Sequence, residues 1–354
     1  MNYNYGFDDG QSGFDLYRSS IKASAKKIFS RFHLSLFLML IISYAVTFAI
    51  EAVMVICFAD SYNEIFSNVY FVSIISVLPM YAVGLPTLFL IVRKMPKKTL
   101  EKSKIPFSEF IILFAIAEAL MLIGSTIGNT FNGIFEVFLK KEITDGTSEL
   151  IENMPIWLMI IIVVIIGPLV EEFIFRKLMI DRLSRCGNIL AITVSAIAFG
   201  LFHGNFYQFF YAALLGWLLG YVYVRSGKWV YSFIMHAIIN FFGSVAVLPI
   251  MKMSEELLTY SEALLNGEAI DMKRYMICSI AVSSYSIIQY AVAVAGIIML
   301  VLAFRKKRLR IKSSPQIHIP REDIFSVVFL NVGTILFVGF SILVFGFSII
   351  SGII

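Results

Sequence analysis

Long apolar runs alternate with short polar segments along the whole chain. A helix needs about 20 residues to cross a hydrocarbon core of about 30 Å. Nine runs approach or exceed that length, and we predict transmembrane helices at approximately 34–58, 69–92, 108–131, 156–180, 189–204, 206–224, 229–250, 276–304 and 325–353. The fifth run is the shortest, and it joins the sixth through a tight connection at Gly204-Asn205.

The polar segments divide the chain into consecutive parts. Residues 1–33 form a polar cytoplasmic tail, whose first 25 residues contain Gly and Ser and are expected to be loosely ordered. Residues 34–131 hold three helices, 155–250 a central core, and 276–354 the last two helices. In the outer connection 251–275, leucines and acids recur at roughly helical spacing, which predicts a short interfacial helix. The pattern therefore predicts one all-α, polytopic membrane domain.

Composition agrees with this interpretation. Of the 354 residues, 59% are hydrophobic and 15% charged, and the mean hydropathy is +0.84, which lies outside the range of soluble globular domains. We therefore predict a multi-pass integral membrane protein, placed in a bacterial cell membrane by the family resemblance described below. The three cysteines are scattered without C-x-x-C spacing, so no disulfide framework or cysteine zinc site is indicated.

The basic residues predict the orientation of the chain in the membrane, because short cytoplasmic loops collect Lys and Arg. Nine helices with a cytoplasmic N-terminus place 23 of the 29 Lys and Arg residues in cytoplasmic segments and five on the opposite side. The net charge of +5 is therefore attributed to the basic residues that orient the chain in the membrane, and we expect no nucleic-acid partner.

Polar residues at membrane depth are rare in this chain, and most of them gather in three of the predicted helices. Ionisable groups inside a bilayer cost about 2.5–3.5 kcal/mol each, so they usually have a partner or a task. The fourth predicted helix contains Glu171, Glu172 and Arg176, the fifth Phe199 and His203, and the seventh His236 and Asn240. The helical rise of 1.5 Å per residue allows these groups to reach a similar depth.

The spacing of these residues also indicates which of them share a helix face. Glu172 and Arg176 are at i, i+4, which allows an ion pair on one helix face. Glu171 is about 100° further round the helix, so it faces different surroundings. From the residues alone, three interpretations are open: a polar brace between helices, a proton or ion pathway, and hydrolysis by a carboxylate-activated water.

Three motifs taken together resemble a known family. The motifs are EEFIFR from Glu171 to Arg176, FGLFH from Phe199 to His203, and HAIIN from His236 to Asn240. They resemble the signature of the CPBP family, the intramembrane proteases that include type II CAAX prenyl proteases, Abi-like and lysostaphin-resistance-like proteins. The resemblance covers about residues 155–245.

The resemblance implies an intramembrane endopeptidase and a role for each motif residue. Glu171 would be the general base, and His203 would bind the same water. His236 and Asn240 would donate to the oxyanion of the tetrahedral intermediate. Glu172 and Arg176 would be an ion-paired support, and Phe199 would shape the cavity wall.

The resemblance leaves the cofactor and the substrate open. We expect no cofactor, with zinc held by Glu171, His203 and His236 as the alternative; the two mechanisms use the same residues and differ in their response to a chelator. The expected partners are the lipid bilayer and a membrane-associated or lipidated peptide or protein substrate. The opposing classes are a non-catalytic immunity or scaffold protein and a proton-coupled transporter.

Overall fold

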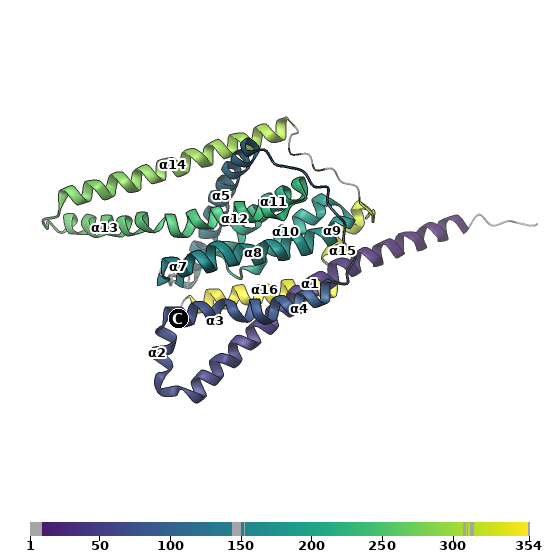
Figure 1. Ribbon diagram of the computed structural model, residues 1–354, viewed down its shortest axis with the longest axis horizontal. Helices are drawn as coiled ribbons and strands as arrows, with labels where there is room; N and C mark the ends of the chain where they lie inside the picture. The colour runs from purple at the N-terminus through teal and green to yellow at the C-terminus, as the bar shows by residue number, and fades with distance from the viewer. Residues whose placement is uncertain are drawn as a thin grey trace, which may run out of the picture. The chain divides into compact units, whose positions relative to one another are not determined.

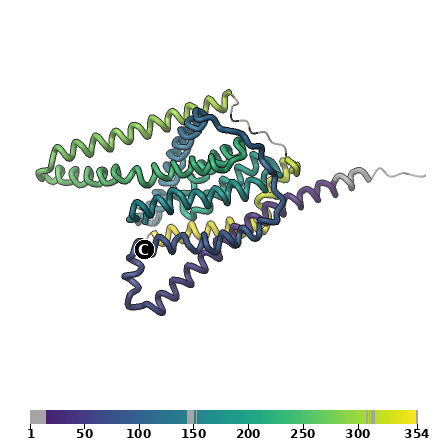
Figure 2. Tube along the Cα trace, in the orientation of Figure 1, coloured from purple at the N-terminus to yellow at the C-terminus, as the bar shows by residue number. Residues whose placement is uncertain are grey.

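The structure is a computed structural model that describes residues 9–143, 150–151, 153–306, 309, 311 and 315–352, with side chains from residue 15 onward (Figures 1 and 2). Every regular element in these ranges is helical, which confirms the predicted all-α class. Residues 1–8 of the predicted tail, and Lys307, Arg308, Arg310 and Lys312 of the basic segments, lie outside the described residues.

The helices follow one another along the chain with several short 3-10 and π-helical stretches between them. In order they are α1 Asp9–Cys57, η1 Ala59–Ser61, α2 Tyr62–Ser67, α3 Val69–Pro79, η2 Met80–Gly84, α4 Leu85–Val92, α5 Phe107–Leu139, α7 Ile156–Met159, η3 Ile160–Ile166, α8 Gly167–Glu172, η4 Phe173–Ile180, α9 Asp181–Leu183, η5 Ser184–Cys186, α10 Asn188–Phe202, α11 Phe206–Ser226, α12 Trp229–Asn240, η6 Phe241–Ala246, α13 Leu248–Leu265, α14 Met272–Arg305, η7 Arg321–Asp323, α15 Ile324–Val328 and α16 Val332–Ser351.

Eight continuous helical segments in the described part are long and apolar enough to cross a membrane. They are Asp15–Cys57, Val69–Val92, Phe107–Leu139, Ile156–Cys186, Phe206–Ser226, Trp229–Leu265, Met272–Arg305 and Val332–Ser351. The chain is therefore a multi-pass membrane protein. The fifth predicted run forms α10, a shorter apolar helix of 15 residues with a length of about 22 Å.

The helices form two compact units, each assembled from distant parts of the chain. The first contains Met1–Leu100, Lys177–Ser195 and Lys312–Phe347, and the second contains Glu101–Arg176, Ala196–Ile311 and Ser348–Ile354. The division cuts across the four consecutive segments of the sequence prediction, because packing joins residues that chain order separates.

In the first unit, α1 packs against α3, η2, α4 and α15. The helix α1 begins at Asp9, so the segment predicted as a loosely ordered tail is helical over its described part. Ion pairs hold this extension: Asp323 accepts from Lys22 Nζ at 2.8 Å and from Arg18 Nε at 2.9 Å. Deeper in α1, His33 Nδ1 lies 2.8 Å from the Thr334 hydroxyl of α16.

In the second unit, α5 packs against both α11 and α14, and α13 packs along α14 as a helical hairpin (Figures 1 and 2). Arg274 of α14 forms a bidentate ion pair with Glu256 of α13, with N–O distances of 2.7 and 2.8 Å. The segment predicted as a short interfacial helix in 251–275 is helical as α13, which begins at Leu248 and continues the segment that starts at Trp229; its interfacial position stays a prediction.

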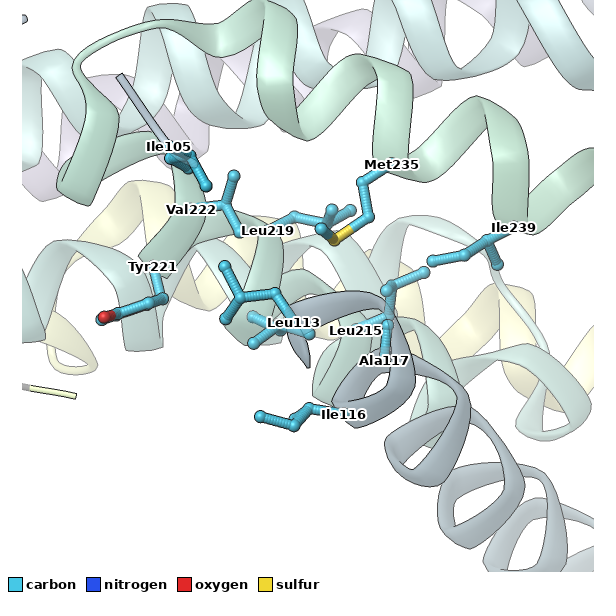
Figure 3. Close-up of a cluster of buried hydrophobic side chains, with 11 residues drawn as sticks. Ile105, Leu113, Ile116, Ala117, Leu215, Leu219, Tyr221, Val222, Met235 and Ile239 are labelled. Carbon is cyan, nitrogen blue, oxygen red and sulfur yellow. The ribbon is translucent and has the colours of Figure 1, made fainter. Parts of the chain in front are cut away.

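A buried apolar cluster joins α5, α11 and α12 and fixes the rotation of α12 (Figure 3). Met235 and Ile239 of α12, which are 0% and 4% exposed, point into this cluster against residues such as Leu215 and Leu219 of α11. Each is followed in sequence by a motif residue, His236 or Asn240. Because neighbouring positions on a helix differ by about 100°, the buried pair determines where the motif pair points.

The α10 segment from Ala196 onward lies against α11 with close backbone contact. A Cβ atom added at Gly200 would lie 2.7 Å from the carbonyl oxygen of Phe209, and one added at Gly216 would lie 2.9 Å from the ring of Phe199. The two glycines therefore allow the short helix to pack tightly on its neighbour. This contact fixes Phe199, which is 1% exposed.

Candidate active site

Glu171 and Glu172 close the short helix α8, and π-helical stretches lie on both sides of it. The stretch η3 ends at Ile166 before α8 begins, and η4 starts at Phe173 directly after Glu172. A third π-helical stretch, η6, follows Asn240. Such stretches are rare and occur frequently at functional sites, because they change the direction of side chains along a helix.

Glu172 and Arg176 form the ion pair that their spacing predicts. Arg176 Nε donates to Glu172 Oε2 at 3.0 Å, and both side chains are 0% exposed. The guanidinium carbon of Arg176 also lies 5.0 Å from the centre of the Phe199 ring. A buried charge without a partner would be costly, so each member stabilises the other in the interior.

His236 lies between the two glutamates, with one ring nitrogen facing each of them. Its Nδ1 donates to Glu172 Oε1 at 3.2 Å, and its Nε2 lies 3.6 Å from Glu171 Oε2. The distance to Glu171 exceeds that of a good hydrogen bond. The two acids, which sequence spacing turned toward different surroundings, thus approach opposite edges of one imidazole.

Charge balance determines what this arrangement can do. Two carboxylates and one guanidinium leave one negative charge, and an additional proton on His236 or Glu171 makes the group of four residues neutral. Since Nδ1 already donates to Glu172, His236 has a second donor at Nε2 only when it carries that proton.

Glu171 differs from Glu172 in its accessibility. Its side chain is 18% exposed, whereas that of Glu172 is fully buried. Of the two carboxylates, only that of Glu171 is therefore accessible from outside the cluster.

His203 stands in the turn after α10, and its orientation is defined by its own helix. Nδ1 of His203 lies 2.8 Å from the carbonyl oxygen of Phe199. A carbonyl can only accept, so Nδ1 carries the proton and Nε2 has the lone pair in the neutral ring. The Phe199 ring contacts both imidazoles edge to face, with its centroid 4.8 Å from that of His203 and 5.8 Å from that of His236.

Asn240 is held one turn beyond His236 on α12. Its amide nitrogen donates to the carbonyl oxygen of Val163 in η3 at 2.9 Å. An amide nitrogen has two N–H groups, so one of them is not used by this bond. Asn240 is half-buried, which leaves this second donor within reach of a bound group.

The structure thus brings Glu171, Glu172, Arg176 and His236 into one cluster, with His203 adjoining it through Phe199. Sequence reasoning missed one of the partners, the Val163 carbonyl, which no sequence signal marks. It also missed Gly216, although the small residues Gly216 and Gly220 at i, i+4 are a known signal of close helix packing.

The zinc alternative does not fit this donor arrangement. Over the described residues, no group of three or more His, Cys, Asp or Glu side chains is placed to hold a metal ion. A catalytic zinc site uses three protein ligands, and the described residues offer no such set, so zinc is not supported.

Comparison with known proteins gives a family for this part of the chain. Residues 153–242 match the family model described as "Type II CAAX prenyl endopeptidase Rce1-like". This range contains every motif residue of the site. This match confirms the resemblance to the CPBP family of intramembrane proteases that the three motifs indicate.

Two bacterial relatives agree with this assignment. The chain is 29% identical over 188 residues to the "Putative membrane peptidase YdiL" of Bacillus subtilis (strain 168), which covers 52% of this chain and 76% of the relative. It is also 29% identical over 103 residues to the "UPF0177 protein YxdF" of Lactococcus lactis subsp. lactis (strain IL1403), covering 29% of this chain and 57% of that relative. No solved structure matches the chain. The family and the first relative support a peptidase.

Proposed function

We propose that the chain is an intramembrane endopeptidase in which Glu171 deprotonates a water molecule that attacks a peptide bond. The observation that carries the proposal is the contrast between the two acids: Glu172 is sealed by Arg176 and His236, whereas Glu171 is 18% exposed beside them. A general base must be reachable by the water from which it takes a proton, and such catalysis contributes about 10²–10⁴-fold.

The other motif residues complete the proposed reaction. His203 orients the water through the lone pair on Nε2, because Nδ1 donates to Phe199. When His236 carries the additional proton, its Nε2–H and the second N–H of Asn240 stabilise the oxyanion of the tetrahedral intermediate. Glu171 takes the proton of the water and delivers it to the amide nitrogen that leaves.

The proposed substrate is a membrane-associated or lipidated peptide, as for CAAX proteases. The site residues belong to apolar helices of the second unit, so a peptide must reach the site from the membrane or its surface. A C-terminal peptide with a prenyl group can do this, because its lipid partitions into the bilayer while its amide bonds remain available for cleavage.

A non-catalytic brace is the second candidate, and one observation favours it for part of the cluster. Glu172, Arg176 and Nδ1 of His236 form a buried ionic contact between α8, η4 and α12. That contact would stabilise the helices in an inactive protein as well. The exposure of Glu171 supports the peptidase over the brace, because a brace gains nothing from an accessible carboxylate.

The test uses the purified full chain in lipid vesicles with a farnesylated CAAX peptide and the same peptide without the lipid. Products of wild type, Glu171→Gln and the exposed control Glu255→Gln are identified by mass spectrometry, with and without a chelator. We expect cleavage by wild type and the control, a loss of about 10²–10⁴-fold for Glu171→Gln, and no effect of chelator. Cleavage by folded Glu171→Gln at the wild-type rate would contradict the proposed base. An absence of product, combined with uptake of an ion or solute by sealed vesicles, would favour a transporter.

A further inference from the structure

A separate pocket of about 610 Å³ lies entirely within the first unit. It is lined by the beginning of α1, by Met95 and Pro96 after α4, by Arg185 of η5, and by residues 315–318. None of its residues belongs to the glutamate and histidine cluster, so the proposed peptidase activity gives it no task.

The polar side of this pocket is basic. Lys27, Arg31 and Arg185 line it, and no acidic side chain is among the described residues that do so. These three residues form no ion pair with any described residue. Earlier on the same helix, Arg18 and Lys22 are both paired with Asp323. The cations next to the pocket are thus neutralised by an acid, whereas the three cations that line it are not.

Each of the two arginines donates a hydrogen bond to a neighbouring segment. Arg31 Nη2 donates to the carbonyl oxygen of Ile91 at 3.0 Å, and Arg185 Nε donates to Gln316 Oε1 at 3.0 Å. The backbone N–H groups of Gln316 and Ile317 both donate to the Arg185 carbonyl, at 2.8 and 2.9 Å. Each guanidinium has five N–H groups, and one anchoring bond leaves a fork that matches phosphate oxygens.

The pocket also lies where apolar helices end. Arg31 precedes the apolar run of α1, Met95 follows the segment that ends at Val92, and Arg185 is next to Cys186, the last residue of its segment. Ile28 and Met95 supply buried apolar wall. Cations beside apolar wall at the ends of membrane helices are the chemistry that recognises the headgroup of an anionic phospholipid.

We propose that this pocket binds the phosphate headgroup of an anionic phospholipid from the leaflet that the charge distribution predicts to be cytoplasmic. Arg31 and Arg185 contact the phosphate oxygens, and Lys27 adds charge at the rim. The proposal is independent of the proposed peptidase activity, because it rests on different residues and a different ligand.

The experiment measures lipid retention by the full chain in detergent, using native mass spectrometry during titration with phosphatidylglycerol or phosphatidylcholine. The test variant is Arg31→Gln/Arg185→Gln. The control, Lys102→Gln/Lys104→Gln, removes the same charge from exposed positions outside the pocket. We expect wild type and control to prefer phosphatidylglycerol, and the pocket variant to bind it roughly 30-fold more weakly.

A third variant and a soluble competitor make the outcome decisive. Arg31→Lys/Arg185→Lys keeps the charge and should retain intermediate affinity, which also shows that the pocket still folds. Inorganic phosphate at millimolar concentration should not displace the lipid. Equal phosphatidylglycerol affinity in wild type and the glutamine variant would overturn the proposal. Equal binding of phosphatidylcholine, or displacement by free phosphate, would overturn the assignment to an anionic lipid.

Discussion

Glu172 Oε1 lies 3.2 Å from Nδ1 of His236, although 64 residues separate the two in the chain. Because Glu172 also accepts from Arg176, this one carboxylate links α8, η4 and α12. It is fully buried, so its interactions stabilise the site and leave the accessible carboxylate of Glu171 for the substrate.

The first prediction compares how much Glu171 and Glu172 each contribute to the stability of the protein. Glu172→Gln leaves Arg176 as a buried charge without its carboxylate, and we expect a loss of about 3–5 kcal/mol in the free energy of unfolding. Glu171→Gln should change it by no more than about 0.5 kcal/mol. Unfolding by denaturant in detergent micelles measures both. Replacing both partners, as Glu172→Leu/Arg176→Met, should recover part of the loss; equal stability of the two single variants would contradict these roles.

The second prediction concerns the two nitrogens of His203. In His203→Asn, the amide can replace Nδ1 and donate to the Phe199 carbonyl, but nothing replaces Nε2. We expect the unfolding temperature to remain near that of wild type and kcat to fall by about 10²-fold or more. The rate of peptide cleavage and the thermal unfolding curve are measured on the same preparation. A fully active asparagine variant would show that Nε2 has no part in catalysis.

The third prediction tests the close packing of α10 on α11. In Gly216→Ala the added Cβ would lie 2.9 Å from the Phe199 ring, so the ring must shift and the contacts of Phe199 with His203 and His236 must change. We expect a several-fold loss of kcat and a loss of about 1–3 kcal/mol in stability. Gly243→Ala is the matched control, because its Cβ would meet nothing within 4 Å. Equal effects of the two substitutions would contradict the packing argument.

The fourth prediction tests whether the apolar cluster orients α12. Met235 is fully buried and precedes His236 (Figure 3). Met235→Ala leaves a cavity and should cost about 2–5 kcal/mol, with a lower kcat in the fraction that remains folded because α12 can then rotate. Met235→Leu conserves volume and should cost less than about 1.5 kcal/mol. Cleavage rates per folded molecule should therefore differ between the two variants, and identical rates would speak against this orienting role.

The fifth prediction is a pH dependence of the first unit. Hydrogen bonds from Lys22 and then Arg18 hold the pKa of Asp323 below its ordinary value of 3.8. A lowered pKa in the folded state stabilises the fold above the ordinary value, and this contribution is lost as the pH falls through the folded pKa. We expect the unfolding temperature of the wild type to decrease as the pH is lowered below about 4. The unfolding temperature of Asp323→Asn should be lower at neutral pH and should change less with pH. Parallel pH profiles for the two proteins would exclude this contribution.

The sequence by itself determined which segments are helical, because long apolar runs and the spacing of polar residues are properties of single helices. It also identified Glu171, His203, His236 and Asn240 as the candidate set. The structure adds what single helices do not show: α10 ends at Phe202 before a turn in which Gly204 has a positive φ, and Arg18 and Lys22 of the predicted tail pair with Asp323 of η7.

Only the tertiary structure decided how these residues meet. Periodicity places His236 on a face of α12 but does not say what that face meets, and the burial of Met235 and Ile239 against α5 and α11 decides this. The same packing brings both glutamates to one imidazole, seals Glu172 and leaves Glu171 accessible. The basic pocket joins residues 27–31, 95–96, 185 and 315–318, a combination that a local pattern cannot contain because its members meet only after folding.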